Sequence, residues 1–163
     1  MEVKIRQALE KDIDRIMNLL HQVNDVHADG RPDLFLHGRT KYDVDDLRKI
    51  ISNPTTPVFV GIDSADRLAG YCFCIIEDHS ESRNLAPVKT LYIDDLCVDK
   101  DCRGKHVGRT LYNAVKNYAE ENGFYNITLN VWCCNPGAMK FYESLGMKPM
   151  KIAMETITAR DEA

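Results

Sequence analysis

The sequence has no long hydrophobic run and no excess of positive charge. Its longest apolar run, Tyr71 to Ile76, is far too short to cross a bilayer, which takes about 20 apolar residues. Lys and Arg total 21 against 25 Asp and Glu, and the resulting net charge of −4 argues against general nucleic-acid binding. The first residues, Met1 to Arg6, lack the apolar stretch of a secretory signal. We therefore expect a cytoplasmic protein with neither membrane nor nucleic-acid partners.

Cys-x-x-Cys pairs are also absent, which excludes the usual spacing of a structural zinc site. Six cysteines are nevertheless present, at positions 72, 74, 97, 102, 133 and 134. Without a secretory signal we expect no disulfide framework and no metal, and we expect buried thiols that act as small hydrophobic side chains. A reactive or redox cysteine stays open as the alternative.

The composition is that of one globular domain. The chain has 163 residues, of which 44% are hydrophobic and 28% charged, and this length corresponds to a single domain with its own core. No internal repeat or low-complexity tract interrupts it. We assign residues 1–157 to the domain and expect residues 158–163 to form a frayed tail.

Hydrophobic periodicity predicts an alternating series of strands and helices. Apolar residues at steps of three and four mark helices, and proline or glycine marks their ends. The predicted strands are Val3 to Arg6, Val58 to Ile62, Leu68 to Glu77, Thr90 to Val98, Ile127 to Trp132 and Met147 to Thr156. The predicted helices carry Ile13 to Val23, Val44 to Ile51 after an Asp43 cap, Val107 to Tyr118, and the segment from Asn135 to Gly146; residues 27–42 are predicted as loop. The order predicts an α/β fold with a mixed sheet and helices on both faces.

A basic turn, Arg103-Gly104-Lys105-His106-Val107-Gly108, joins a predicted strand to a predicted helix. The free N–H groups at a helix N-terminus bind anions, and the glycines allow a phosphate to approach the backbone. The turn matches neither the Walker loop nor the dinucleotide-binding pattern. Taken alone, an ordinary strand–helix turn with solvated basic side chains explains it equally well.

A second segment, Asn135 to Met147, follows about thirty residues later. Asn135 and Pro136 are typical of a helix start, and Phe141 and Tyr142 come in its second half. Read alone, Asn135 is a helix cap and the two aromatic residues belong to the core.

Together the two segments resemble the cofactor-binding motifs of the GNAT N-acetyltransferase superfamily. Arg103 and Gly108 match the first motif, while His106 stands where the family usually has glycine. The second motif is matched by Asn135, Ala138, Phe141, Tyr142, Gly146 and Met147. The resemblance extends along nearly the whole chain and implies the family's fold, a mixed and mostly antiparallel central sheet.

The resemblance implies acetyl-CoA as co-substrate, with its pyrophosphate on the amides of the basic turn and its pantetheine arm beside the strand 90–98. That strand and the strand 127–132 are expected to splay apart and admit the thioester. The implied cofactor-binding residues are Leu96, Cys97, Val98, Arg103, Gly104, Lys105, His106, Val107, Gly108, Arg109, Asn135, Ala138 and Phe141.

Acetyl transfer needs a neutral amine and a protonated leaving thiol. The stretch Leu91 to Val98 resembles diamine and spermidine-type acetyltransferases, which implies Asp94 as general base and Asp95 facing the substrate. Tyr142 matches the residue that protonates the departing thiolate in the family. Structural or solvated roles for the two carboxylates stay open, and so does a covalent route through Cys97 or Cys133.

The acceptor pocket is less well defined by the sequence. In the family the segment between the first two helices, here His27 to His37, forms its wall, and we add Phe35, Asn130 and Trp132 to Asp95 as substrate-binding residues. The acidic residues favour a small cationic amine such as a polyamine. A protein or peptide acceptor, a non-catalytic acyl-CoA-binding module and a homodimer remain open.

Overall fold

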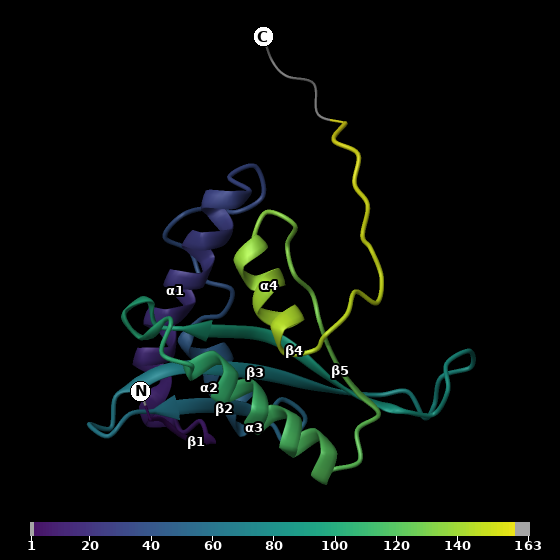
Figure 1. Ribbon diagram of the computed structural model, residues 1–163, viewed down its shortest axis with the longest axis horizontal. Coiled ribbons are helices and arrows are strands. Elements are labelled where there is room, and N and C mark those ends of the chain that lie inside the picture. The colour runs from purple at the N-terminus through teal and green to yellow at the C-terminus, as the bar shows by residue number, and fades with distance from the viewer. Residues whose placement is uncertain (1, 159–163) are drawn as a thin grey trace.

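The computed structural model describes residues 2–158, which form a five-stranded sheet with helices on both faces (Figure 1). The strands are β1 (Lys4–Gln7), β2 (Val58–Ile62), β3 (Leu68–Asp78), β4 (Lys89–Val98) and β5 (Asn126–Leu129). The helices are α1 (Ile13–Gly30), α2 (Val44–Ser52), α3 (Val107–Glu121) and α4 (Pro136–Ser144), with short 3-10 turns at Glu10–Asp12 and Lys100–Cys102. Strands β1 to β4 pair antiparallel in chain order, and β5 lies parallel to β4. The predicted mixed, mostly antiparallel sheet is confirmed.

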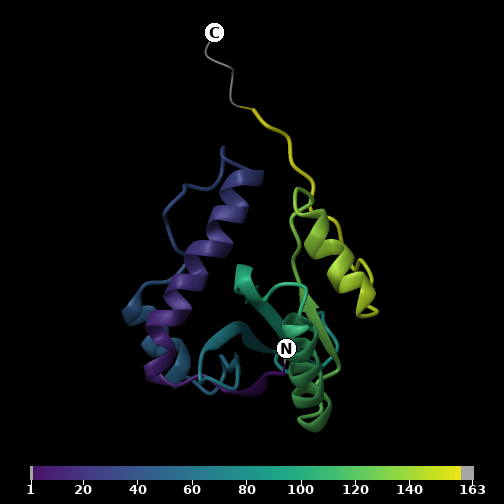
Figure 2. The same ribbon diagram turned by 60° about the vertical axis from the view of Figure 1, so that its left-hand side comes forward.

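Each face of the sheet has its own hydrophobic core. Ile16, Leu19 and Leu20 of α1 pack with Leu47 of α2 on one face. On the other face α3 buries an apolar stripe, including Leu111, against β3 and β4. The three- and four-residue spacing of these positions is what the sequence pattern predicted. As Figure 2 shows, the end of β4 lies between α1 and α4.

Side-chain caps fix two of the helix starts. The Asp43 carboxylate accepts a 2.8 Å hydrogen bond from the Asp46 amide, and Asp46 bonds back to the Asp43 amide. The Asn135 side chain accepts from the Ala138 amide at 3.1 Å, with Pro136 in the first helical turn. These bonds satisfy amides that the helix itself leaves without a partner, and they confirm both predicted caps.

Two predicted boundaries and one predicted strand are wrong. Helix α1 continues to Gly30, because Ala28 is buried and His27 stacks on Phe35, so the last turn packs rather than unwinds. Strand β5 ends at Leu129 instead of Trp132. The predicted strand Met147 to Thr156 is also absent, since residues 147–158 contain no strand. Alternating apolar residues give a strand only when an edge pairs with it, and no strand of the described chain does so here. In the expected tail, residues 159–163 lie outside the described part.

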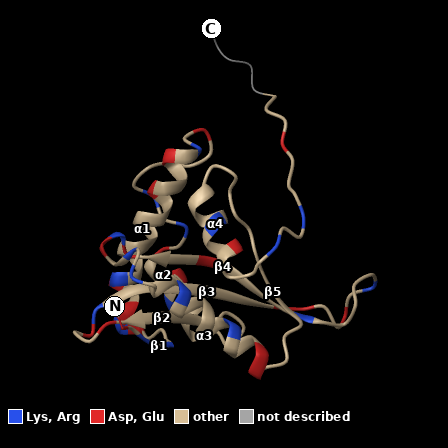
Figure 3. Cartoon of the chain, viewed as in Figure 1, with Lys and Arg blue, Asp and Glu red and all other residues tan. Residues whose placement is uncertain are grey.

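No helix among the described residues is long and apolar enough to span a membrane. Acidic and basic residues are interspersed over the helices and loops (Figure 3).

Candidate active site

The sheet opens where β4 loses its partner β5. The parallel pairing covers only Thr90 to Ile93 of β4, after which β4 continues to Val98 with hydrogen bonds to β3 alone. The Asp99 amide donates to Ala69 of β3 at 2.9 Å. Because amides alternate in direction along a strand, the Val98 amide points to the open side. This is the opening that the family resemblance implied.

A β-bulge at the same place brings two consecutive carboxylates to one face. Phe73 of β3 pairs with Asp95 and Cys74 pairs with Ile93, so Asp94 is the extra residue of β4. A bulge re-aims side chains that would otherwise alternate across the sheet. Asp94 and Asp95 consequently both find hydrogen-bond donors on the side covered by α1 and α2.

Asp94 is held by two side chains from the loop before α2. Lys41 Nζ and the Tyr42 hydroxyl each donate a 2.6 Å hydrogen bond, one to each carboxylate oxygen. The Asp94 side chain is only 10% exposed. Burial, then the bond to Asp94, raises the pKa of Tyr42 well above its usual range, so Tyr42 stays a donor. Neither partner of Asp94 was predicted from the sequence, because a contact between residues more than fifty positions apart leaves no local pattern.

Asp95 has a different environment from Asp94. It accepts a 2.7 Å hydrogen bond from the hydroxyl of the fully buried Tyr71. Burial raises the pKa of Asp95 to about 6, although the Tyr71 bond and the Lys41 charge act in the opposite direction. A carboxylate with such a pKa is mostly ionised at neutral pH and can still accept a proton, which suits a general base.

Tyr142 approaches this pair from α4. Its ring packs at 5.0 Å against Phe141. Burial raises the pKa of Tyr142, with smaller contributions from Cys72 and Asp95, so its hydroxyl keeps its proton at neutral pH. The influence of Asp95 places Tyr142 within electrostatic range of the carboxylate pair. A carboxylate that can accept a proton and a hydroxyl that keeps its proton thus lie on elements around the open end of β4.

The basic turn ends in a helix N-terminus with free amides. The first intrahelical bond of α3 runs from the Thr110 amide to the His106 carbonyl, so the amides of residues 107–109 precede it. The first turn of α3 contains no acidic residue. His106 is in the left-handed conformation at φ 65°, which explains why glycine is usual there and costs about 1–2 kcal/mol.

The cationic side chains of this turn contact neighbouring elements. Arg103 donates to the Val98 carbonyl at 3.3 Å, Lys105 to the Asp101 carbonyl at 2.7 Å, and Arg109 to Ser144 Oγ at 3.2 Å. All three side chains stay exposed. They can therefore add positive charge beside the free amides of α3.

Gly108 allows α4 to pack against the start of α3. A Cβ at Gly108 would lie 3.1 Å from Cζ of Phe141 and 3.4 Å from Val98. The glycine thus joins β4, α3 and α4 at one point beside the free amides. Free amides, cations and this close packing fit a bound pyrophosphate, as a CoA cofactor requires.

The predicted acceptor residues form an aromatic cluster. Phe35 stacks on His27 with ring centroids 5.2 Å apart and meets Trp132 edge-on at 5.4 Å. Burial, then the Lys41 charge, lowers the pKa of His27, whose Nδ1 has no hydrogen-bond partner among the described residues. Asn130 donates to the Tyr92 hydroxyl at 3.1 Å. The cluster joins the end of α1 to the loop after β5.

The end of α1 and the loop after β5 make a second contact. A Cβ at Gly30 would lie 2.8 Å from Cys134 Sγ, so the last residue of α1 packs directly on the loop before α4. In the loop after α1, Arg31 forms ion pairs with Asp33 and, at 2.5 Å, with Glu155. The acceptor side of the site is therefore closed by α1, the loop after it and the loop after β5.

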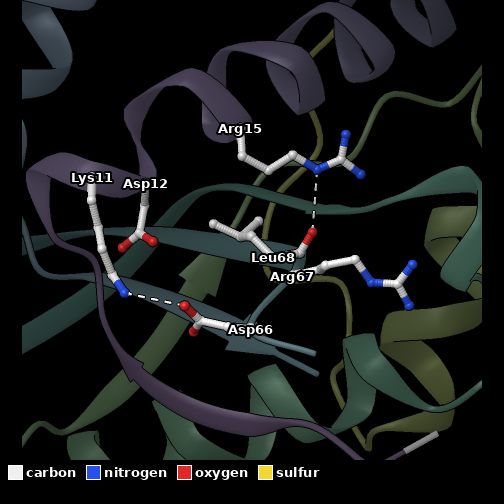
Figure 4. Close-up of a pocket in the computed structure, with 6 residues that line it drawn as sticks. All are labelled: Lys11, Asp12, Arg15, Asp66, Arg67 and Leu68. Carbon is white, nitrogen blue, oxygen red and sulfur yellow. Dashed lines mark hydrogen bonds and ion pairs between the residues drawn. The ribbon is translucent and has the colours of Figure 1, made fainter. Parts of the chain in front are cut away.

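A pocket of about 420 Å³ lies elsewhere, at the start of α1 and the turn after β2 (Figure 4). Lys11 pairs with Asp66 there, and Arg15 donates to the Leu68 carbonyl at 3.3 Å. None of the predicted site residues lines this pocket. The groups that could perform acetyl transfer lie at the open end of β4 instead.

The six cysteines are free thiols. Cys72, Cys74 and Cys97 are buried as expected, whereas Cys133 and Cys134 are exposed, so the expectation of burial is wrong for that pair. Burial raises the pKa of Cys97, which donates to the Leu19 carbonyl. Such a thiol is a poor nucleophile. In the described part of the chain, no three His, Cys, Asp or Glu side chains could together hold a metal ion.

The sequence profile of the Acetyltransferase (GNAT) family matches residues 20–147, which include the turn, both carboxylates and α4. The chain belongs to the GNAT family. An uncharacterised N-acetyltransferase of Methanocaldococcus jannaschii is 31% identical over 81 residues, half of this chain and 34% of that protein. The chain therefore spans about a third of that curated relative.

Several solved structures share the fold along nearly the whole chain. A mutant form of a Bacillus halodurans protein superposes with a TM-score of 0.91 at 28% identity, covering 96% of this chain and 99% of that one. Glucosamine-6-phosphate N-acetyltransferase of Arabidopsis thaliana gives a TM-score of 0.70 at 20% identity, over 98% of this chain and all of that one. An aminoglycoside acetyltransferase from an uncultured soil sample, solved with sisomicin, gives 0.73 at 18% identity over 97% of both chains.

Proposed function

We propose that this GNAT protein transfers an acetyl group from acetyl-CoA to a small primary amine, with residues 1–157 as its catalytic domain. The observation that carries the proposal is the grouping of Asp94, Asp95 and Tyr142 around the unpaired end of β4. The family match supports the reaction class.

Acetyl-CoA would bind along the open edge of β4 and at the start of α3. The amides of Val107, Gly108 and Arg109 are available to a pyrophosphate, and the side chains of Arg103, Lys105 and Arg109 add charge. The pantetheine arm would run beside the backbone of residues 96–98. The Asn135 side-chain amide nitrogen can contact it, because the cap bond uses only the side-chain oxygen. Ala138 and Phe141 follow on the same helix.

The acceptor amine must first lose a proton. A free alkylammonium with a pKa near 10.4 is about 3.4 units from neutrality at pH 7, which costs roughly 4–5 kcal/mol. We assign the base to Asp95 and not to Asp94, the reverse of the sequence-based assignment. Asp95 has the pKa of about 6, and its side-chain donor, the Tyr71 hydroxyl, is neutral. Both oxygens of Asp94 already accept bonds, so Asp94 acts as a holder of cationic groups.

Transfer would then proceed by direct attack. The neutral amine attacks the thioester carbonyl, whose oxygen can accept a hydrogen bond from the Val98 amide. As the C–S bond breaks, the Tyr142 hydroxyl donates its proton to the sulfur. The buried, protonated Cys97 supports this route over an acetyl-cysteine intermediate, because only a thiolate is a good nucleophile.

The acceptor would be cationic, with a polyamine as the first candidate, because two carboxylates face it and the chain carries a net charge of −4. Phe35 and Trp132 offer it an apolar wall. Amino sugars belong in the same test, since the solved relatives of similar fold include proteins named for aminoglycoside and glucosamine-6-phosphate acetylation.

The test is release of free CoA thiol from acetyl-CoA with a panel of polyamines, amino sugars, amino acids and peptides. Turnover with at least one small amine, lost in Tyr142→Phe and kept in Tyr125→Phe, is expected; Tyr125 is an exposed tyrosine outside the site. A preference for peptides over every small amine would mean that the acceptor is a peptide and not a small amine. No turnover with any amine, despite bound acetyl-CoA, would leave only an acyl-CoA-binding module.

We also propose a homodimer formed by residues 148–158. Met150, Ile152 and Met154 alternate along this segment and are 77%, 79% and 88% exposed. The described chain gives the segment no backbone hydrogen bonds, and β5 pairs with β4 alone. The free edge of β5 in a second copy is the partner that such a segment fits.

The dimer is tested by light scattering on the full chain. A dimer that dissociates in Met154→Asp, but not in the loop control Leu85→Asp, is expected. A monomeric wild-type protein would refute the dimer.

A cytoplasmic location is proposed because the six cysteines are free thiols, which reducing compartments maintain.

A further inference from the structure

A primary amine of the chain itself lies on the carboxylate pair. Lys41 Nζ is 2.6 Å from Asp94 Oδ1, although the two residues are 53 positions apart. The Lys41 charge also acts on Asp95 and lowers its pKa. Lys41 therefore occupies the side of the site where an acceptor ammonium would meet Asp94.

We propose that Lys41 is a self-acetylation site, which accepts the acetyl group from acetyl-CoA bound to the same chain. The proposal rests on the proposed function, because it uses the same thioester and the same acid. It adds a second product, the acetylated protein.

The placement of Lys41 sets it apart from other surface lysines. Asp94 is the bulge residue at the point where β4 becomes unpaired, Asp95 follows it in the strand, and the charge of Asp95 acts on Tyr142. The Lys41 side chain is 51% exposed, so it can swing from Asp94 toward the open edge of β4. Holding an amine beside the reacting carbonyl converts an intermolecular step into an intramolecular one, which accelerates it strongly.

The step balances in atoms and charge. The Lys41 ammonium, whose charge already acts on Asp95, gives one proton to Asp95, and the neutral nitrogen attacks the thioester carbonyl carbon. An N–C bond forms and the C–S bond breaks, with its electron pair leaving on sulfur. The thiolate takes the Tyr142 proton, and the second proton of the nitrogen restores Tyr142. The products are acetyl-lysine, free CoA and one proton, which Asp95 releases to water.

Acetylation would alter the site as well as the lysine. An acetylated Lys41 carries no charge, so it cannot maintain the ion pair with Asp94. That carboxylate would then be free to hold the ammonium of an incoming acceptor. Self-acetylation would in this way favour cationic acceptors.

Lys116 provides a control inside the same protein. Its side chain is 55% exposed and its Nζ lies 3.6 Å from the Glu120 carboxylate on α3. It resembles Lys41 in exposure and in having an acidic neighbour, and it differs in lying away from the open end of β4. Uncatalysed acetylation by acetyl-CoA should therefore modify the two lysines to similar extents.

The experiment incubates the full-length protein with acetyl-CoA and no acceptor, then measures acetyl occupancy at both lysines by peptide mass spectrometry. Initial acetylation of Lys41 about 100-fold faster than that of Lys116 is expected from a positioned base and proximity. Its rate per molecule should not change with protein concentration. Tyr142→Phe should reduce acetylation of Lys41 and leave that of Lys116 unchanged.

Equal acetylation of the two lysines would overturn the proposal. The same preparation is assayed on the amine panel, which separates the two claims. Turnover of an added amine with no preference for Lys41 would reject self-acetylation and keep the proposed function. A preparation that acetylates neither Lys41 nor any added amine would reject both self-acetylation and the proposed function.

Discussion

The Tyr71 hydroxyl donates a 2.7 Å hydrogen bond to Asp95 from the neighbouring strand. Tyr71 is fully buried, so the bond is built into the core and does not depend on a mobile side chain. It stabilises the ionised form of Asp95, while burial of the carboxylate favours the protonated form. The balance sets the pKa of Asp95 at about 6, which is the basis for proposing it as the general base.

The pH profile of turnover should carry the signature of Asp95. Below its pKa of about 6 the carboxylate is protonated and cannot accept the amine proton, so kcat/KM should fall as pH decreases through 6. Asp95→Asn should lower kcat by about 10²–10⁴-fold and remove this acidic limb. Asp94→Asn serves as the matched control and should keep the limb. An unchanged limb in Asp95→Asn would assign the base elsewhere.

Tyr71→Phe should move the same limb to higher pH. The substitution removes the hydrogen bond that lowers the pKa of Asp95, so the carboxylate becomes protonated nearer to neutrality. Activity at pH 6 should therefore fall more than activity at pH 8. A purely structural role for Tyr71 would lower activity equally at both values, and the pH profile distinguishes the two cases.

Tyr142→Phe should separate catalysis from binding. Removing the hydroxyl eliminates the proton donor for the thiolate but leaves the ring against Phe141. We expect kcat to fall by about 100-fold or more, with the Kd for acetyl-CoA unchanged in calorimetry. Tyr112→Phe, at a buried tyrosine of α3, is the control and should keep kcat. Full activity of the Tyr142 variant would remove this residue from the mechanism.

His106→Gly should stabilise the protein. His106 has φ 65°, where a side chain costs about 1–2 kcal/mol and glycine does not. We expect the unfolding midpoint to rise by about 2–4 °C for each kcal/mol recovered, with acetyl-CoA binding equal or tighter. His106→Ala, which keeps the Cβ and the strain, should show no such rise. A lower midpoint in the glycine variant would mean that the imidazole makes a stabilising contact.

The sequence predicted those parts of the fold that depend on local patterns. Strand β2 has the predicted bounds, and the Asp43 and Asn135 caps form as expected. In each case the residues involved lie within a few positions of one another. The segment 147–156 shows the limit of such patterns, because its alternation of apolar residues is that of a strand whereas pairing depends on an edge that a sequence does not show.

The site was predicted residue by residue only where a motif defined it. The motifs named Tyr142 and the turn before α3, and their roles stay predictions. The bulge at Asp94 depends on the register with β3, and the Tyr71, Tyr42 and Lys41 contacts depend on tertiary packing. The resemblance implied Asp94 as base and Asp95 facing the substrate, and these contacts are the reason why we propose Asp95 as the base instead.

Acetyl-CoA binding is the claim on which the other steps depend. Thermal unfolding with acetyl-CoA at 100 times its Kd should show a stabilisation of about 2.7 kcal/mol, or roughly 5–10 °C for a chain of this size. NADH and ATP, which lack the pantetheine arm, should give smaller shifts. A shift with acetyl-CoA above both controls is the predicted result. No shift at millimolar acetyl-CoA would contradict a cofactor site at β4 and α3, and the proposed transfer with it.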